Sequence, residues 1–387
     1  MRVVVLGAGI VGAACARELA RRGLAVTVLD RGGPAAATTA HGEGNVLVSD
    51  KGPGPELELA RLSRRLWPEI LAEHEAPPAD AVEWDAKGGI VVATTDAGAR
   101  ELARFADSQR AAGITADTLD AAALAEAEPH VTRDVALAVH YPEDAQVQPS
   151  GAAAFLLGGA LRAGAELRTG CEVLGAVTSG GRLTAVRTSA GTIEADAFVN
   201  ATGPWSGEVA ARLGAPVDVR PRRGEVLVTT PQPPLVFHKV YDADYVGAVG
   251  SGAEELQASA VVESTRAGTI LLGSSRRRVG FDDRLRPEVL SVIARKALRL
   301  FPCLAGVPVM RAYGGFRPYV PDHLPVIGPD PRLPGLWHAG GHEGAGIGLS
   351  PGTALLLADL LTGRAPQIDP APFRVDRPAV LFEGDDQ

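Results

Sequence analysis

The chain has 387 residues, of which 46% are hydrophobic and 22% charged, a composition typical of globular proteins. Its length allows two domains or one large α/β unit. The formal net charge of −8 argues against general binding of nucleic acids or of an anionic membrane surface.

The three cysteines lie far apart in the sequence, and no apolar run approaches the ~20 residues that a membrane span needs. The apolar residues at the N-terminus belong to the first strand of a nucleotide fold rather than to a signal peptide. We therefore expect a cytoplasmic protein that has no disulfide bond and no membrane or nucleic-acid partner.

The first thirty residues carry the most informative pattern. A strand precedes the turn Gly7-x-Gly9-x-x-Gly12, a helix follows it, and a second strand ends in Asp30. Gly7 allows a tight turn, Gly9 lets a pyrophosphate approach the backbone, and Gly12 lets the helix pack against the strand. Asp30 is placed to accept hydrogen bonds from a ribose. The pattern predicts a dinucleotide site, with a glycine-rich turn of another α/β protein as the alternative, and leaves NAD or FAD open.

The remaining elements follow from periodicity and turn residues. We expect helices over residues 56–73, 97–112, 120–126, 150–162, 287–300 and about 351–361. We expect strands over residues 89–93, 197–201, 220–230, 259–263, 269–273 and from 336, and a β-hairpin over residues 177–185 and 187–193 with Gly180-Gly181 at its turn.

Helical and β-rich stretches alternate in a way that predicts two interleaved units. One unit comprises residues 1–80, 141–215 and 321–387 and binds the nucleotide. The other is a mixed or antiparallel sheet, inserted twice, at residues 81–140 and 216–320. The expected fold class is therefore α/β, with a Rossmann-like domain and a discontinuous substrate-binding domain. Simple NAD dehydrogenases usually keep the nucleotide fold contiguous.

Two further motifs bear on the cofactor. Thr202-Gly203, in the sequence NATGPWS, ends a predicted strand and lets the backbone pass close to a ligand. Near the C-terminus, GGHEGAGIGLSP joins a strand to a helix through a glycine-rich loop. The first N–H groups of that helix would face a flat ligand, and its dipole would stabilise the negative charge of a reduced flavin.

With these motifs the sequence resembles the D-amino acid oxidase/glycine oxidase superfamily of FAD-dependent oxidoreductases. GAGIVG with Asp30-Arg31, the Thr38–Asn45 loop, NATGPWS, GGFRPYVPDHLPVIG and GGHEGAGIGLSP carry the resemblance, which spans residues 3 to 352. It implies FAD, extended along the N-terminal motif, and a substrate domain whose sheet lies over the flavin. The implied cofactor-binding residues are Gly7, Gly9, Ile10, Val11, Gly12, Asp30, Arg31, Thr38, Thr39, His41, Gly42, Gly44, Val173, Ala201, Thr202, Gly203, Trp205, Gly341, Gly344, Ala345, Gly346, Ile347 and Gly348.

The GHEGxGI form looks closest to that of dehydrogenases of D-hydroxyproline and related secondary amino acids. Glycine oxidases carry a phenylalanine and an arginine after the histidine, where this chain has Glu343 and Gly344. The second carboxylate-binding arginine of the family is therefore missing, which argues against glycine or sarcosine as the substrate.

The resemblance also implies the catalytic and substrate-binding residues. Arg317 falls on the family's carboxylate-binding arginine, and a guanidinium matches a carboxylate in two parallel hydrogen bonds. The candidates beside it are Tyr241 and Tyr245, expected in a sheet region, where each either hydrogen-bonds a carboxylate or simply packs in the sheet, and His342 and Glu343, expected beside the flavin. Glu343 is expected either to accept a hydrogen bond from the substrate or to cap the last helix.

Three other residues receive less specific expectations. Arg276 falls near the place where some family oxidases keep a lysine, and we expect it to be a surface arginine. His41 falls where related amine dehydrogenases attach their flavin covalently, and we expect it to lie beside the flavin without a bond. His323 follows a proline turn and is expected to be a loop residue.

The resemblance implies oxidation of an amino acid or N-substituted amino acid. The amine becomes an imine, a hydride passes to flavin N5, and water hydrolyses the product; O2 or a redox partner reoxidises the flavin. The alternative is a dehydrogenase of D-proline or D-hydroxyproline type that uses another acceptor or a partner subunit. A NAD-dependent dehydrogenase and a non-catalytic flavin-binding module are further readings. No metal site is expected, because no HExxH or CxxC spacing occurs.

Overall fold

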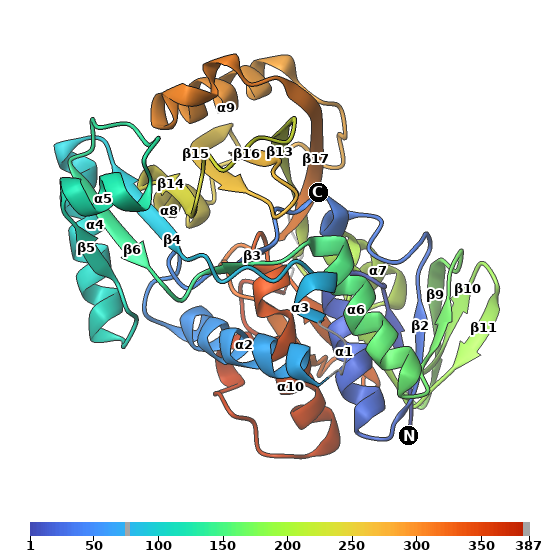
Figure 1. Cartoon of the computed structure of the whole chain (residues 1–387). Helices are drawn as coiled ribbons and strands as arrows, with labels where there is room; N and C mark the ends of the chain where they lie inside the picture. Colours follow the sequence, from blue (N-terminus) through green and yellow to red (C-terminus); the bar gives the residue numbers. More distant parts are fainter. Residues whose placement is uncertain (74–77, 382–387) are drawn as a thin grey trace.

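The computed structural model describes residues 1–73 and 78–381. Residues 74–77, in the predicted segment 1–80, and residues 382–387, in the predicted segment 321–387, lie outside the described residues. Two large sheets and the helices around them make up the described chain (Figure 1). One sheet is mostly parallel and the other mostly antiparallel. This arrangement confirms the predicted α/β fold class.

The six-stranded sheet has the order β18-β19-β12-β1-β2-β8, and only β18 runs antiparallel to its neighbour. Its strands are β1 (Arg2–Leu6), β2 (Ala25–Leu29), β8 (Glu166–Arg168), β12 (Ala197–Asn200), β18 (Val326–Pro329) and β19 (Leu336–Gly340). Except for the exposed edge strand β8, they read as short apolar runs because side chains on both faces are buried, as in other parallel sheets.

Alternate side chains of β1 enter two different cores. Val3 and Val5 pack with the four helices on one face, whereas Val4 and Leu6 pack with a small sheet on the other. The helices are α1 (Ile10–Arg21), α2 (Pro55–Ala72), α6 (Pro149–Arg162) and α10 (Gly346–Thr362). The small sheet consists of β9 (Val173–Ser179), β10 (Arg182–Thr188) and β11 (Gly191–Glu194).

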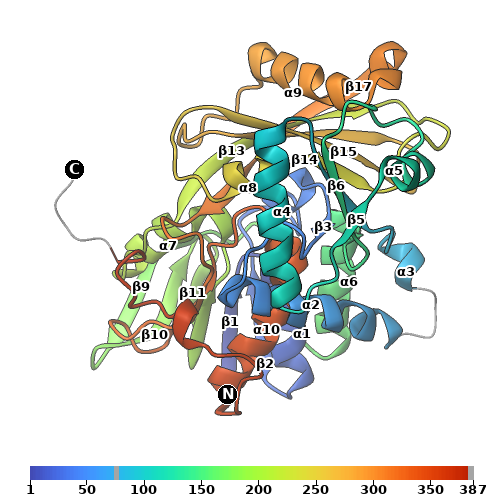
Figure 2. The same cartoon turned by 90° about the vertical axis from the view of Figure 1, so that its left-hand side faces the viewer.

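The eight-stranded sheet has the order β17-β13-β16-β15-β14-β4-β6-β5 and is antiparallel except where β14 meets β4. Its strands are β4 (Gly89–Ala93), β5 (Asp117–Leu119), β6 (Leu137–Tyr141), β13 (Arg220–Thr229), β14 (Lys239–Asp242), β15 (Gln257–Ser264), β16 (Ile270–Arg276) and β17 (Val309–Tyr319). One face packs on α9 (Pro287–Leu300), and Figure 2 shows α9 above this sheet with α1, α2 and α10 at the opposite end.

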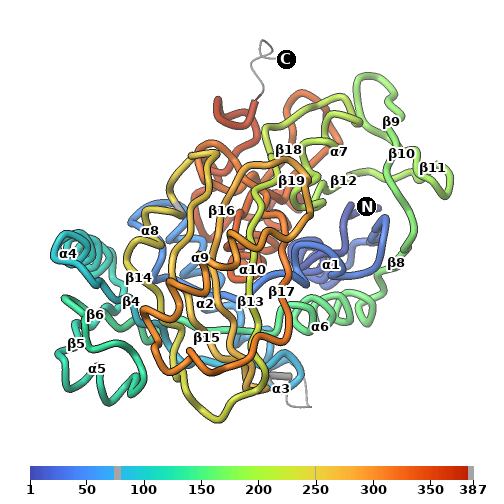
Figure 3. The backbone as a smooth tube through the Cα atoms, turned by 90° about the horizontal axis from the view of Figure 1, so that it is seen from above, coloured from blue at the N-terminus to red at the C-terminus, as the bar shows by residue number. Residues whose placement is uncertain are grey.

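Shorter elements connect these layers. They are α3 (Pro78–Ala81), α4 (Asp96–Ala111), α5 (Ala121–Ala127), α7 (Ser206–Leu213), α8 (Asp244–Val249), β3 (Asn45–Val46), β7 (Ala145–Gln146) and the 3₁₀ turns η1 (Thr38–His41), η2 (Gly203–Trp205), η3 (Pro302–Gly306) and η4 (Ala371–Phe373). Figures 1 and 3 both show α4 and α5 at one end of the molecule and β9–β11 at the other. The two large sheets meet where β13 and β17 contact η1 and η2.

Most predicted elements occur within one or two residues of their expected bounds, and the helix over residues 287–300 matches at both ends. The strand bounds 177–185 and 187–193 were wrong: the turn at Gly180-Gly181 separates β9 from β10, and β10 continues to Thr188 before β11 begins at Gly191. The strands of the eight-stranded sheet fall in residues 81–140 or 216–320, except that β6 ends one residue later, at Tyr141, and every strand of the six-stranded sheet falls outside these ranges. We propose the predicted domain division on this basis. No helix among residues 1–73 and 78–381 combines the length and apolar character that crossing a membrane requires.

The start of the last helix was predicted wrongly. The sequence places it near Pro351, whereas α10 begins at Gly346 and contains that proline. A proline inside a helix leaves the carbonyl four residues earlier without its N–H donor. Here the Ser350 hydroxyl donates to the Ile347 carbonyl at 3.0 Å, which supplies the missing hydrogen bond. The first turn of α10 therefore lies within the glycine-rich loop.

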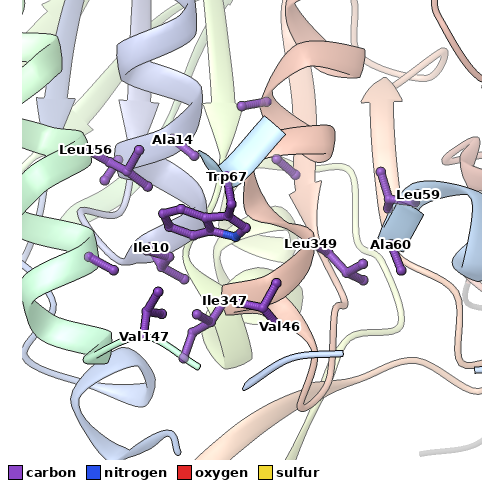
Figure 4. Close-up of a cluster of buried hydrophobic side chains, with 14 of the residues drawn as sticks. Ile10, Ala14, Val46, Leu59, Ala60, Trp67, Val147, Leu156, Ile347 and Leu349 are labelled. Atoms are coloured by element: carbon purple, nitrogen blue, oxygen red, sulfur yellow. The ribbon is translucent and has the colours of Figure 1, made fainter. Parts of the chain in front are cut away.

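Trp67 of α2 occupies the centre of the main core, where α1, α2, α6 and α10 converge (Figure 4). Its side chain is fully buried, and Ile10, Leu156 and Ile347 lie around it in the figure. An indole in this position fills space that no neighbouring side chain reaches.

Replacing Trp67 with alanine should therefore leave a cavity and lower the free energy of unfolding by about 3–5 kcal/mol. Leu174→Ala is the control, because Leu174 is 52% exposed and surface changes usually stay within about 0.5 kcal/mol. Chemical denaturation of both variants measures the difference. Equal free energies of unfolding for the two variants would contradict this account of the core.

Candidate functional site

One pocket extends from the ends of β1 and β2 to the inner side of the large sheet. It is lined by glycine-rich segments of the six-stranded sheet and by residues of β13 and β17. The predicted residues that line it are Gly7, Gly9, Ile10, Val11, Asp30, Arg31, Thr38, Thr39, His41, Gly42, Gly44, Val173, Ala201, Thr202, Gly203, Trp205, Tyr245, Arg317, His342, Glu343, Gly344, Gly346 and Ile347.

The β1–α1 turn forms one end of the pocket. Gly7 has φ +103°, and a Cβ there would lie 2.5 Å from the Ala201 carbonyl oxygen. Gly9 is the N-cap of α1 and provides no side-chain cap. The Asp30 carboxylate accepts the backbone N–H of Ala8 at 2.8 Å. This cradle of bare backbone and N–H groups fits a pyrophosphate, with a carboxylate at the position expected for the ribose.

Four predicted cofactor residues do not line the pocket: Gly12, Gly341, Ala345 and Gly348. A Cβ at Gly12 would overlap the Gly7 carbonyl oxygen, and one at Gly348 would meet the Asn45 carbonyl oxygen. These two glycines lie behind the pocket wall. Gly12 lets α1 pack closely on the β1–α1 turn, and Gly348 lets α10 pack closely on β3. Gly340, which was not predicted, lines the pocket instead of Gly341.

The aromatic side of the pocket joins the two sheets. The Arg31 guanidinium lies 4.1 Å from the centroid of the Trp205 ring, and that ring stacks on Phe281 with centroids 5.3 Å apart. Thr38 donates from its hydroxyl to the Phe316 carbonyl at 2.7 Å. These contacts hold η1 and η2 against β17.

Arg317 faces the pocket from β17, which pairs with β13 so that Arg317 lies opposite Arg222. Its Nη1 donates to the Ser275 carbonyl at 2.8 Å. A Cβ at Gly224 would overlap the guanidinium, so this glycine provides the space for it. Removal from water, together with the nearby Arg276, lowers the pKa of Arg317 to about 10, so the side chain stays protonated at neutral pH.

Within the described part of the chain, no carboxylate lies within 4 Å of the Arg317 guanidinium. The neighbouring Arg222 differs, because it donates to Glu343 at 3.1 Å and to the Ser251 carbonyl at 2.7 Å. A cation that faces a pocket without a counter-ion is suited to bind an anion. Arg317 therefore presents a cation without a close counter-ion to the pocket.

The two tyrosine candidates lie in different surroundings. Tyr241 is fully buried in β14, and its hydroxyl donates to Ser49 at 2.7 Å, so the prediction that it contacts substrate is wrong. Burial raises its pKa well above the usual value. Tyr245 lines the pocket but belongs to the short helix α8 rather than to a strand.

Arg276 was expected at the surface, and this expectation is also wrong. It is 3% exposed, and its guanidinium lies 4.6 Å from the centroid of the Tyr245 ring. The strand β16 extends to Arg276, three residues beyond its predicted end, and carries the side chain into the interior.

His342 and Glu343 lie between Gly341 and the start of α10. Burial lowers the pKa of His342 to about 3, and its Nε2 is hydrogen-bonded to the Thr353 hydroxyl at 2.9 Å. A neutral imidazole in this setting does not act as an acid or base near neutral pH. Glu343 accepts from His323 Nδ1 at 2.6 Å and from Arg222, so it does not cap α10, whose N-cap is Ala345.

His41 lines the pocket from η1, and its Nδ1 donates to the Ala37 carbonyl at 2.7 Å. A carbonyl only accepts, so the proton lies on Nδ1. Its position beside the flavin and the absence of a covalent bond remain predictions.

Sequence reasoning missed Glu43, Asn45 and Gly224, which also line the pocket. Glu43 could have been noticed as the one acidic residue of the Thr38–Asn45 loop. Gly224 carried no signal, because only its neighbour across the sheet gives it a role. Among residues 1–73 and 78–381, no group of three or more His, Cys, Asp or Glu side chains is arranged to hold a metal ion.

Comparisons with known proteins agree with this geometry. The family described as FAD dependent oxidoreductase matches residues 2–360. The bifunctional protein ThiO/ThiG of Trichormus variabilis is 31% identical over 366 residues, which cover 93% of this chain and 52% of that protein. The chain therefore spans about half the length of that relative.

Two relatives match over nearly their full length. The glycine oxidase of Geobacillus kaustophilus is 30% identical over 97% of this chain and 96% of its own. The crystal structure of the glycine oxidase from this organism superimposes with a TM-score of 0.87 at 28% identity, and the match covers 97% of this chain and 99% of that one. The D-amino acid dehydrogenase of Cereibacter sphaeroides is 30% identical over 97% of this chain and 95% of its own.

The role of Gly224 in making space for the Arg317 guanidinium can be tested. Gly224→Ala should displace the Arg317 guanidinium and weaken the binding of a simple carboxylate by about tenfold or more, because a charge-assisted hydrogen bond is lost. Titration of the purified flavoprotein with cyclopentanecarboxylate, followed by the absorption of the bound flavin, measures the dissociation constant.

Gly247→Ala is the matched control, since no atom lies within 4 Å of a Cβ there. Both variants should retain their flavin. Unchanged carboxylate affinity in Gly224→Ala would show that the Arg317 position described above is not needed for binding.

Proposed function

The chain belongs to this family of FAD-dependent oxidoreductases, and from that premise we propose that it oxidises an amino acid or N-substituted amino acid whose carboxylate is held by Arg317. The observation that carries the proposal is the unpaired Arg317 cation, which faces the same pocket as the glycine-rich start of α10. The relatives named glycine oxidase and D-amino acid dehydrogenase support a substrate of this class.

The residues of the pocket fit FAD at both ends. The Gly7–Gly9 turn and Asp30 would receive the pyrophosphate and the adenosine ribose, while Thr202-Gly203 and the first turn of α10 would face the flavin. The N-cap of α10 is Ala345, which offers no side-chain cap, so the N–H groups of this turn remain free for a ligand. Bound FAD supplies an acceptor for the two electrons and the hydrogen of the C–H bond.

The chain's own residues bind and orient the substrate. The planar Arg317 guanidinium can form two parallel hydrogen bonds with a carboxylate, and its bond to the Ser275 carbonyl fixes the plane of the fork. Fixing the carboxylate restricts where the adjacent α-carbon can lie, which is the main contribution that positioning makes to such a reaction. The neutral amine then provides the electron pair for the C=N bond, and water hydrolyses the imine unless it is cyclic.

The alternative proposal keeps the chemistry and changes the electron acceptor. A dehydrogenase acting on D-proline or D-hydroxyproline types of cyclic amino acid would pass electrons to a quinone or a partner subunit instead of O2. The Glu343-Gly344 pair in place of the glycine-oxidase residues supports this alternative. We retain a cytoplasmic location as part of the proposal.

Arg317→Ala should raise KM steeply while FAD remains bound. Truncating one partner of a desolvated charge pair costs about 2–5 kcal/mol, which corresponds to about 30-fold or more in KM. Steady-state kinetics and the flavin-to-protein absorbance ratio measure the two quantities. Arg311→Ala, on the same strand but exposed, is the control; an unchanged KM in Arg317→Ala would reject the carboxylate assignment.

The substrate and the acceptor can be identified together. Anaerobic mixing with D-proline, D-hydroxyproline, sarcosine and longer N-alkyl glycines should bleach the oxidised flavin band with at least one of them. Reoxidation of the reduced protein by O2 and by an artificial dye then separates the two proposals. Fast reaction with O2 supports an oxidase, and fast reaction with the dye alone supports a dehydrogenase. A failure of every amino acid to bleach the band would count against both.

A further inference from the structure

Glu43 lies between η1 and β3 and lines the same pocket as Arg317. Its side chain is only 8% exposed. Within the described part of the chain, its Oε1 is buried and has no hydrogen-bond partner. Nearly all buried polar atoms in folded proteins are paired, so an unpaired carboxylate oxygen at a pocket requires an explanation.

The other carboxylate oxygen is held in place. Oε2 accepts from the Asn45 side-chain amide at 3.2 Å, and Lys239 Nζ lies 3.9 Å from it. Lys239 is closer to Glu263, at 3.1 Å, and donates to the Asn45 Oδ1 at 2.6 Å. The lysine is therefore shared between Glu43 and Glu263, and Lys87 Nζ also lies 3.7 Å from Glu263.

The strand β16 locates Glu43 relative to Arg317. A Cβ at Gly273 would overlap Glu43 Oε1, so this oxygen lies directly beside Gly273, whereas the Arg317 guanidinium bonds to the Ser275 carbonyl.

No ion pair within 4 Å joins Glu43 to Arg317 in the described residues, although Glu43 raises the pKa of Arg317. An anion and a cation thus line the same pocket without a close ion pair between them.

We propose that Glu43 binds the amino group of the substrate through its carboxylate while Arg317 holds the substrate carboxylate, so that the two side chains recognise the two charges of one zwitterion. This inference rests on the function proposed above. The substrate ammonium transfers one proton to the Glu43 carboxylate, which leaves a neutral amine with a free electron pair. That pair forms the C=N bond as the hydride leaves the α-carbon for FAD, and the product is an iminium ion.

Isosteric probe pairs test the proposal directly. Sarcosine and butyrate, and likewise D-proline and cyclopentanecarboxylate, differ only in an NH₂⁺ group replaced by CH₂. Dissociation constants come from the absorption of the bound flavin in the holoenzyme. For a probe that reduces the flavin, they come from the concentration dependence of the anaerobic reduction rate.

Glu43→Gln should weaken the binding of the amino member of a pair by about 10- to 100-fold, the range for losing a hydrogen bond to a charged group. The carboxylic member should bind equally well or more tightly, because a negative charge has been removed. Glu128→Gln is the matched control: Glu128 is fully buried and also has an unpaired oxygen, but it does not line the pocket. It should change neither affinity.

Two further variants make the outcomes distinguishable. Glu43→Asp keeps the charge and should retain more of the preference for the amino member than Glu43→Gln does. The aspartate variant also tests the proposal if the glutamine variant loses its flavin. Arg317→Ala should weaken both members.

If Arg317→Ala weakens both members but Glu43→Gln does not discriminate between them, the Glu43 inference is overturned and the proposed function stands. If Arg317→Ala changes neither member, or no probe binds the wild-type protein, the proposed function itself is overturned.

Discussion

The antiparallel pairing of β13 with β17 is the constraint on which the substrate end of the pocket depends. Its register sets Arg222 opposite Arg317 and Gly224 opposite Gly315. The same strand β17 offers the Phe316 carbonyl to Thr38, which ties the large sheet to η1. A shift of one residue in this register would turn Arg317 to the other face of the sheet. The position of the anion-binding group is therefore a property of the sheet as a whole.

Glycines, which have no side chain, shape the pocket as much as the side chains that line it. Gly7 admits the Ala201 carbonyl, Gly224 admits the Arg317 guanidinium, and Gly273 admits the Glu43 carboxylate. In each case a single Cβ would occupy the place of a backbone or charged group. Glycine weakens a strand, because it loses more conformational freedom on folding than any other residue and has no side chain to pack. Glycine persists where close approach is required.

The pocket also holds charges that the described residues do not pair closely. Arg317 has no carboxylate within 4 Å, and Glu43 shares Lys239 with Glu263. Removing charges from water without a close partner opposes folding. By contrast, the Arg222–Glu343–His323 set is mutually paired. On the proposed function, the paired groups maintain the walls of the pocket, and Arg317 and Glu43 bind the substrate.

The sequence by itself determined the elements and the cofactor end. The Gly7–Asp30 pattern, the helix over residues 287–300 and the α/β class all follow from local spacing, because turns, caps and periodicity act within a few residues. Local rules failed for β17, where Gly314, Gly315 and Pro318 disfavour a strand, and for α10, where Ser350 compensates for Pro351. Only the tertiary structure decided that the Tyr241 hydroxyl donates a hydrogen bond to Ser49, that Arg276 is buried, and that Glu43 lies beside Gly273. Each of these depends on contacts between residues far apart in the chain, which local spacing does not encode.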